Sequence, residues 1–177
     1  VEAIGVNPVD TYFREGEYPV PRLPFVPGSD LAGVVAAVGD DVERFERGDR
    51  VFGTGLGNGR DGTYADAAVA PASFLAQLPE DVSFAQGAAL ALVGVTAWQA
   101  FVHHAGVEPA QRVLVHGANG GVGHVAVQLA DVIGATVAAT ARQEYHDRLG
   151  RLGADAVFEY ESDLAEKLST FGAPDVI

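Results

Sequence analysis

A glycine-rich turn offers the clearest chemistry in the sequence, because such a turn can bring backbone N–H groups against a phosphate. The apolar run Val113–Val115 is followed at once by His116-Gly117-Ala118-Asn119-Gly120-Gly121-Val122-Gly123. The pattern is A-x-G-x-x-G, with Ala118 where the commonest dinucleotide fingerprint has its first glycine. A tight turn that binds nothing is the alternative. We predict that the turn binds a dinucleotide, with the phosphates over Gly120–Gly123 at the positive end of the following helix. The predicted cofactor residues are Asn119, Gly120, Gly121, Val122 and Gly123.

The choice of cofactor depends on the residue that follows the next expected strand, Thr136–Thr140. Arg142 stands there, 19 residues after Gly123. A guanidinium group pairs bidentately with phosphate, so Arg142 favours NADPH, which carries a 2′-phosphate. Glu144, two residues further on, is the alternative, because an acidic residue there accepts hydrogen bonds from the ribose of NADH.

The elements around this turn alternate between strand and helix. Apolar residues recur at the spacing of one buried helical face, and Gly134 ends the pattern. This face consists of Val122, Val125, Ala126, Leu129, Val132 and Ile133. Two further strands are expected at 136–140 and 156–159, and two helices at 144–152 and 163–171. This order predicts an α/β protein that contains the first half of a doubly wound parallel sheet.

The first part of the chain reads differently, as short strands divided by turns. We expect strands at 1–6, 30–38, 50–52 and 63–69, and helices at 84–90 and 93–104. Five prolines make the segment 7–27 turn-rich. The predicted domains are 1–87, which is β-rich, and 88–177. The chain begins inside a strand pattern and ends inside another at Pro174–Ile177, so we expect an internal piece of a longer protein, with poor cofactor binding and little activity on its own.

Composition narrows the class of protein. The chain has 177 residues, of which 48% are hydrophobic, and the absence of cysteine excludes disulfides, Cys-ligated zinc and thiol catalysis. The longest apolar run, Ala88–Ala97, is shorter than a bilayer span, so we expect no membrane segment and a cytoplasmic location. With 24 acidic residues against 11 basic ones, the net charge is −13, which disfavours nucleic acid and anionic membranes. A halophilic cytosol is our hypothesis for this charge, because high salt screens self-repulsion.

Several motifs in order resemble one family over nearly the whole chain. They are Gly5-Val6-Asn7-Pro8-Val9-Asp10-Thr11-Tyr12, Pro27-Gly28-Ser29-Asp30-Leu31-Ala32-Gly33, Gly48-Asp49-Arg50-Val51-Phe52, Thr96-Ala97-Trp98 and the glycine turn. The sequence resembles the quinone oxidoreductase and zeta-crystallin branch of the zinc-free medium-chain dehydrogenase/reductase superfamily. The resemblance implies a GroES-like catalytic domain, a Rossmann domain with NADPH in the cleft between the two, and a homodimer.

The resemblance also bears on metal. Zinc-dependent members of the superfamily use a cysteine where this chain has Asn7, and Gly-His-Glu where it has Gly28-Ser29-Asp30. The five histidines do not replace these ligands, since packing or solvation accounts for each of them. We therefore expect zinc-independent chemistry.

Roles for individual residues follow from the resemblance as well. It places Asn7, Tyr12 and Tyr18 against the nicotinamide and the acceptor, with Thr96 near the nicotinamide ring. Amide and phenol groups can donate hydrogen bonds to the carbonyl of an acceptor, although loop packing is an alternative role for the two tyrosines. Tyr160 falls where NADPH-dependent relatives hold the 2′-phosphate, with a packing role as its alternative.

These observations lead to one predicted function and two alternatives. We predict an NADPH-dependent, zinc-independent reductase that transfers hydride to quinones or other conjugated carbonyls. The alternatives are an enoyl-thioester reductase and a non-catalytic nucleotide-binding protein, crystallin-like or RNA-binding, although the charge of −13 opposes RNA.

Overall fold

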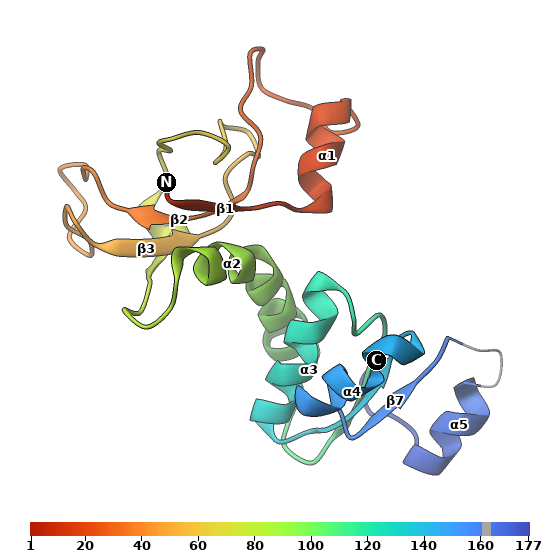
Figure 1. Ribbon diagram of the computed structural model, residues 1–177. Coiled ribbons are helices and arrows are strands. Elements are labelled where there is room, and N and C mark those ends of the chain that lie inside the picture. The colour runs from red at the N-terminus through yellow and green to blue at the C-terminus, as the bar shows by residue number, and fades with distance from the viewer. Residues whose placement is uncertain (161–163) are drawn as a thin grey trace. The chain divides into compact units, whose positions relative to one another are not determined.

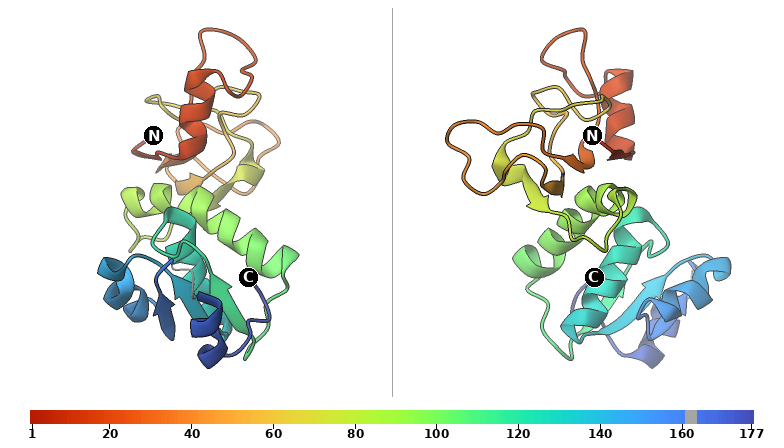
Figure 2. Two further views of the ribbon diagram at one scale, coloured as in Figure 1. Left: turned by 90° about the vertical axis from the view of Figure 1, so that its right-hand side faces the viewer. Right: turned by 60° about the vertical axis from the view of Figure 1, so that its left-hand side comes forward.

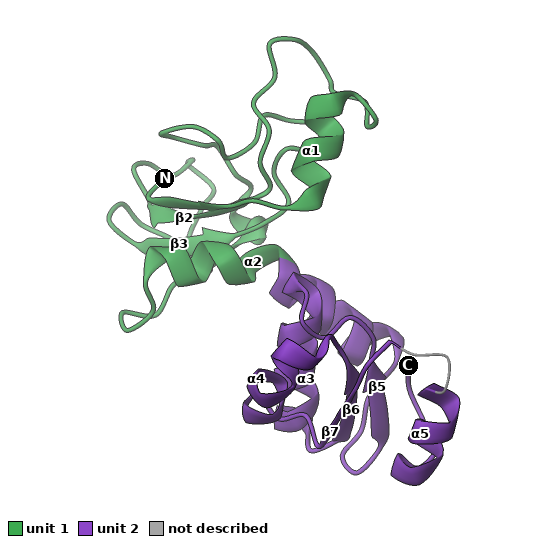
Figure 3. Ribbon diagram, turned by 45° about the vertical axis from the view of Figure 1, so that its right-hand side comes forward, with its two compact units in different colours: residues 1–92 green, residues 93–177 purple. Residues whose placement is uncertain are grey.

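The computed structural model describes residues 1–160 and 164–177, and these form two compact units. Unit 1 comprises Val1–Leu92 and unit 2 comprises Val93–Ile177 (Figure 3). The two units join inside one helix, five residues after the domain boundary predicted between residues 87 and 88.

Unit 1 is built on a four-stranded antiparallel sheet (Figure 1). The strands are β1 (Ala3–Gly5), β2 (Asp30–Val34), β3 (Arg50–Gly53) and β4 (Leu75–Gln77), which pair in this order. A short 3₁₀ helix, Ala72–Phe74, precedes β4. The strand predicted at 63–69 is wrong. Thr63 and Tyr64 donate backbone hydrogen bonds to Gly28 and Pro27, and the segment forms bends without a strand ladder.

A helix occupies part of the segment that the prolines suggested was irregular. This helix, α1 (Pro8–Glu15), begins with Pro8, which fits a first turn because the N–H that proline lacks has no intrahelical partner there. Asn7 is its N-cap, and the Asp10 carboxylate accepts a hydrogen bond from the Asn7 backbone N–H at 2.8 Å. Gly16 ends the helix in the left-handed conformation. The local capping signal therefore outweighed the nearby prolines.

A long apolar helix leads from unit 1 into unit 2. α2 (Phe84–Trp98) continues into a π-helical segment, Gln99–His104, so the two helices predicted here are continuous. Over the described residues it is the one helix long and apolar enough to cross a membrane, with a mean hydropathy of 1.4 and 28% of its apolar window buried. A single helix of this kind is weak evidence, because core helices of soluble proteins meet the same criterion. The absence of a membrane segment stays a prediction.

Unit 2 contains a parallel sheet of three strands, as the alternating pattern predicts. β5 (Arg112–Val115), β6 (Thr136–Thr140) and β7 (Ala156–Phe158) pair in chain order, and Val113 also forms an isolated parallel bridge with Val176. α3 (Gly121–Ile133) and α5 (Leu164–Phe171) lie on opposite faces of the sheet (Figures 1 and 3). α4 (His146–Arg151) follows a 3₁₀ turn at Gln143–Tyr145. Asp163, predicted to begin the last helix, lies outside the described residues.

The core of unit 2 forms where α3 packs against the sheet, and Figure 2 shows this packing from two sides. Ala126, Val127 and Ala130 are the buried apolar residues of α3, while most of its predicted face is partly buried against them. Val132 is a wrong prediction, because it is 83% exposed. The 3.6-residue period turns Val132 away from the sheet and brings Val127 toward it.

Candidate functional site

The glycine turn of unit 2 is held in place by one buried threonine. Thr140, at the end of β6, is fully buried, and its Oγ1 accepts a hydrogen bond from the Gly117 backbone N–H at 3.2 Å. Its carbonyl oxygen accepts a hydrogen bond from the Ala118 N–H at 2.9 Å. Gly117 adopts a φ of +67°, which favours glycine. The turn is thus tied to the neighbouring strand at the carboxyl edge of the sheet, where doubly wound proteins bind nucleotides.

Two glycines of the turn have different tasks. A Cβ on Gly123 would lie 2.7 Å from Ala118 Cα, so only glycine lets α3 start this close to the end of β5. A Cβ on Gly121 would meet no atom closer than Val93 Cγ1, at 3.4 Å. A side chain there would make ordinary contact with Val93, but Gly121 itself is exposed, so its backbone is accessible to a ligand. The first turn of α3 also carries N–H groups without intrahelical partners. These features fit a bound pyrophosphate.

The predicted 2′-phosphate residues lie at the same edge of the sheet. Tyr160 Oη donates a hydrogen bond to Asn119 Oδ1 at 3.4 Å, which brings a residue after β7 against the glycine turn. Arg142 follows β6 and its side chain is 69% exposed. Its guanidinium lies 5.6 Å from the centre of the Tyr145 ring and 3.5 Å from Glu144 Oε1. An exposed ion pair of this kind is weak, so it does not hold Arg142 away from an incoming phosphate.

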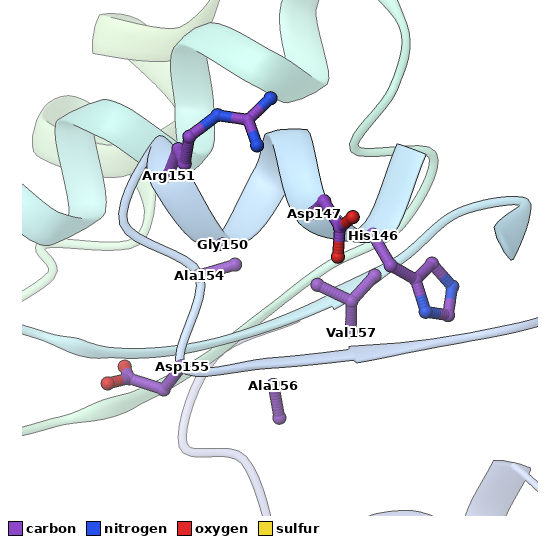
Figure 4. A pocket seen from close by; sticks show the side chains of 8 residues that line it. All are labelled: His146, Asp147, Gly150, Arg151, Ala154, Asp155, Ala156 and Val157. Atoms are coloured by element: carbon purple, nitrogen blue, oxygen red, sulfur yellow. The ribbon is translucent and has the colours of Figure 1, made fainter. Parts of the chain in front are cut away.

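Two hollows accompany this part of the chain. One, of about 450 Å³, is bordered by Gly117, Gly120, Val122 and Gly123, together with apolar residues of β5 and the π-helical segment. The other, of about 490 Å³, lies between α4 and β7 (Figure 4). It contains none of the predicted site residues, and its Asp155 carboxylate accepts a hydrogen bond from the Val137 N–H. The hollow beside the glycine turn is therefore the better candidate for a cofactor.

Unit 1 places Asn7 in a buried polar network. Asn7 Nδ2 donates a hydrogen bond to Asp30 Oδ2 at 2.8 Å, and the Asn7 backbone N–H donates to Asp10 Oδ2 at 2.8 Å. Tyr64 Oη donates to the same Asp10 oxygen at 2.9 Å. Asn7, Asp10 and Asp30 are 9%, 3% and 1% exposed, so the interactions are largely sheltered from water. Two carboxylates thus fix the backbone and the side chain of one asparagine.

Burial changes the acidity of two groups in this network. Desolvation raises the pKa of the Asp30 carboxyl, and the hydrogen bond from Asn7 offsets this only in part. Burial, together with the hydrogen bond to Asp10, raises the pKa of Tyr64 to about 12. Tyr64 is therefore a neutral hydrogen-bond donor at neutral pH.

The structure brings the two predicted catalytic tyrosines together on and just after α1. The Tyr12 and Tyr18 rings meet edge to face with their centroids 5.7 Å apart, and they are 38% and 46% exposed. Phe13 packs against Tyr18 at 5.4 Å. Both tyrosines are partly exposed, and Asn7 is the N-cap of α1, so the three predicted acceptor residues lie on this helix or directly beside its ends. Thr96 lies in the exposed part of α2 and belongs to unit 2.

The side chains that could donate to a metal are scattered over the described part of the chain. Over residues 1–160 and 164–177, no three His, Cys, Asp or Glu side chains gather as a metal site would require. Ser29 and Asp30 are buried, and Asp30 is engaged with Asn7. Zinc independence stays a prediction.

Sequence reasoning missed three residues that organise these sites. Asp10 stands three residues after Asn7 before a helix, a capping pattern that was open to detection. Tyr64 and Thr140 carry no local signal, because their partners lie 54 and 23 residues away. Their roles follow from the fold alone.

Comparisons with known proteins agree with this geometry. Residues 1–80 match the alcohol dehydrogenase GroES-like domain. The human quinone oxidoreductase is 42% identical over 174 residues, which cover 97% of this chain and 52% of the human protein. Over nearly its whole length, the chain is similar to the quinone oxidoreductase branch of the medium-chain dehydrogenase/reductase superfamily. It spans about half the length of the curated relatives it matches. The predicted fold class, a GroES-like domain followed by a Rossmann half, is confirmed.

Two solved structures illustrate the family. A mycobacterial protein complexed with NADPH has a TM-score of 0.81 and 38% identity, covering 96% of this chain and 52% of that one. The enoyl reductase CurK has a TM-score of 0.73 and 33% identity, covering 86% and 46% respectively. Of these two structures, the mycobacterial protein was solved with NADPH and CurK is named as an enoyl reductase.

The two glycines give a matched test of phosphate binding. Gly121→Ala is expected to weaken NADPH binding by at least about tenfold, because a methyl group is added to the exposed backbone that the pyrophosphate would approach, while the melting temperature stays the same or rises slightly. Gly123→Ala is expected to lower stability by about 1–3 kcal/mol through overpacking. Isothermal titration and thermal unfolding separate these outcomes, and unchanged NADPH affinity in Gly121→Ala would contradict the assignment.

The raised pKa of Asp30 predicts a pH dependence of stability. The folded state binds this proton more tightly than the unfolded state, whose pKa is about 3.9. The contribution of Asp30 to stability therefore falls as pH rises from about 4 through its folded pKa. In Asp30→Asn this fall is absent, so the unfolding free energy of the wild type, relative to the variant, should decrease with rising pH.

Urea unfolding at several pH values measures this difference, with the exposed Asp40→Asn as the matched control. A difference that is independent of pH would show that Asp30 is not the titrating group.

Proposed function

We propose that the protein is an NADPH-dependent, zinc-independent reductase of quinones or other conjugated carbonyls. The observation that carries this proposal is the carboxyl edge of the parallel sheet, where the glycine turn follows β5, the exposed Arg142 follows β6, and Tyr160, after β7, contacts Asn119. The family relationship and the neighbour solved with NADPH support it.

Unit 2 supplies the cofactor residues. The N–H groups at the start of α3 would bind the pyrophosphate, and Arg142 with Tyr160 would bind the 2′-phosphate. Tyr145 stands where some family members have a lysine, so Arg142 is the cation that the sequence offers here. When bound, the nicotinamide supplies the hydride.

Unit 1 supplies groups suited to the acceptor. Asn7, Tyr12 and Tyr18 can donate hydrogen bonds to a carbonyl oxygen as negative charge develops on it. Hydrogen bonds hold both the backbone and the side-chain amide of Asn7 before the acceptor binds, so no further conformational entropy is lost in ordering this donor. Such donors stabilise a reduced quinone or enone oxygen without any bond to a metal.

A second candidate is the reduction of enoyl thioesters, which the structural similarity to the enoyl reductase CurK favours. Quinones and enoyl thioesters are both conjugated carbonyl compounds. Addition of hydride to either one places negative charge on a carbonyl oxygen, so the same hydrogen-bond donors serve both substrates. A panel of quinone, enone and enoyl-thioester acceptors with NADPH distinguishes them.

The activity is expected to survive a chelator, and loss with chelator followed by recovery with zinc would refute zinc independence. A protein that binds NADPH but reduces no member of the panel would favour the non-catalytic alternative.

Arg142 is expected to select NADPH over NADH. Arg142→Ala should weaken NADPH binding by about tenfold to a hundredfold, because a charge-assisted phosphate contact is lost, and should leave NADH nearly unchanged. Glu144→Gln is the companion variant, and it should raise NADPH affinity about twofold, because the competing carboxylate is removed. Equal loss of both cofactors in Arg142→Ala would indicate a folding defect instead of a selectivity effect.

A further inference from the structure

We propose that Asp30 is a positioning residue that fixes which end of the Asn7 side-chain amide is presented to the acceptor. The inference rests on the proposed function, in which Asn7 lies beside the acceptor. Asn7 Nδ2 donates to Asp30 Oδ2 at 2.8 Å, and Asp30 is 1% exposed. Asp30 does not itself contact the substrate, so it acts through Asn7.

The chemistry of a carboxylate explains the choice of residue. An amide has a donor end and an acceptor end, and a half-turn about its last bond exchanges the two. The Asp30 Oδ2 atom accepts from the nitrogen end of Asn7, and in its ionised form the carboxylate only accepts hydrogen bonds, so this form holds the amide in that orientation. With the amide turned over, Asn7 Oδ1 would face Asp30 Oδ2, two acceptors against each other. Asp30 therefore favours the orientation of Asn7 that also suits its role as the N-cap of α1, in which the side chain faces the Asp10 backbone N–H and the second N–H of the amide is left over.

The pairing of strands builds this contact. Gly5 of β1 lies opposite Asp30 of β2 in the antiparallel register, and Asn7 follows Gly5 by two residues. A Cβ on Gly5 would come within 2.6 Å of Asp30 Oδ2, so the absence of a side chain there gives the carboxylate its place. Asp10, which accepts from Tyr64 Oη, holds the Asn7 backbone from the other side. The backbone and the amide of Asn7 are thus fixed by independent contacts.

A purely structural pair is the competing explanation, in which Asp30 and Asn7 only satisfy each other in the core. That explanation predicts a loss of stability without a specific effect on turnover. The positioning role predicts a loss of kcat that depends on Asn7. A double-mutant cycle separates the two explanations.

The cycle uses Asp30→Asn, Asn7→Ala and the double variant, with Asp40→Asn as the exposed matched control. Asparagine at position 30 both donates and accepts, so it tolerates either orientation of Asn7. We expect kcat for the quinone to fall about tenfold in Asp30→Asn, while KM for NADPH changes less than about twofold. In the Asn7→Ala background, Asp30→Asn should produce no further fall in kcat. Effects that multiply in the double variant, or a change in KM alone, would refute the positioning role.

A second measurement uses the wild type and needs neither turnover nor a folded variant. The side-chain amide protons of Asn7 should exchange with solvent more slowly than those of Asn58, which is exposed. Equal exchange rates would refute the proposal. A complete polypeptide that reduces no acceptor would refute the proposed function instead, and equal exchange rates for Asn7 and Asn58 would still refute the contact between Asn7 and Asp30.

Discussion

A backbone approach that tolerates no Cβ underlies the arrangement of unit 2. Helix α3 starts immediately after the glycine turn, and Gly123 allows its first turn to lie against Gly117 and Ala118. This closeness directs the free N–H groups of the helix over the carboxyl edge of the sheet. Thr140 secures the other side of the turn through β6. Gly123 thus allows α3 to start close to the end of β5, and Gly117 supplies the positive φ that the turn before it requires.

Unit 1 follows a different principle, since its order comes from buried charge. Burying two carboxylates is costly, as the raised pKa of Asp30 indicates. Their cost is offset by hydrogen bonds that come from Asn7 and Tyr64. A polar network of this kind specifies the positions of its members more strictly than apolar packing does.

The sequence predicts the parts of the fold that depend on local signals. β6 occurs at Thr136–Thr140 as predicted, and α3 begins at the glycine turn and stops before Gly134, because glycine and apolar spacing act within a few residues. Local signals also conflicted at α1, where the capping residues Asn7 and Asp10 outweighed the prolines. Tyr64 and Thr140 were beyond prediction, because their contacts join segments that only the folded chain brings together. The structure brings Tyr12 to Tyr18 and Tyr160 to Asn119, while the catalytic and cofactor roles of these residues stay predictions.

The exposure of Arg142 has a consequence for how the cofactor preference of such a protein changes over evolution. Its guanidinium is exposed and contacts Glu144 and the Tyr145 ring, and Arg142 is not among the residues of the hydrophobic core. Replacing it therefore perturbs the fold very little. Substitution of Gly123 or Thr140 would disturb the fold, since both residues are buried in the packing of the turn. Under the proposed function, the residues that would hold the pyrophosphate are thus inherited with the fold, whereas the preference between NADPH and NADH can change by single substitutions at the surface.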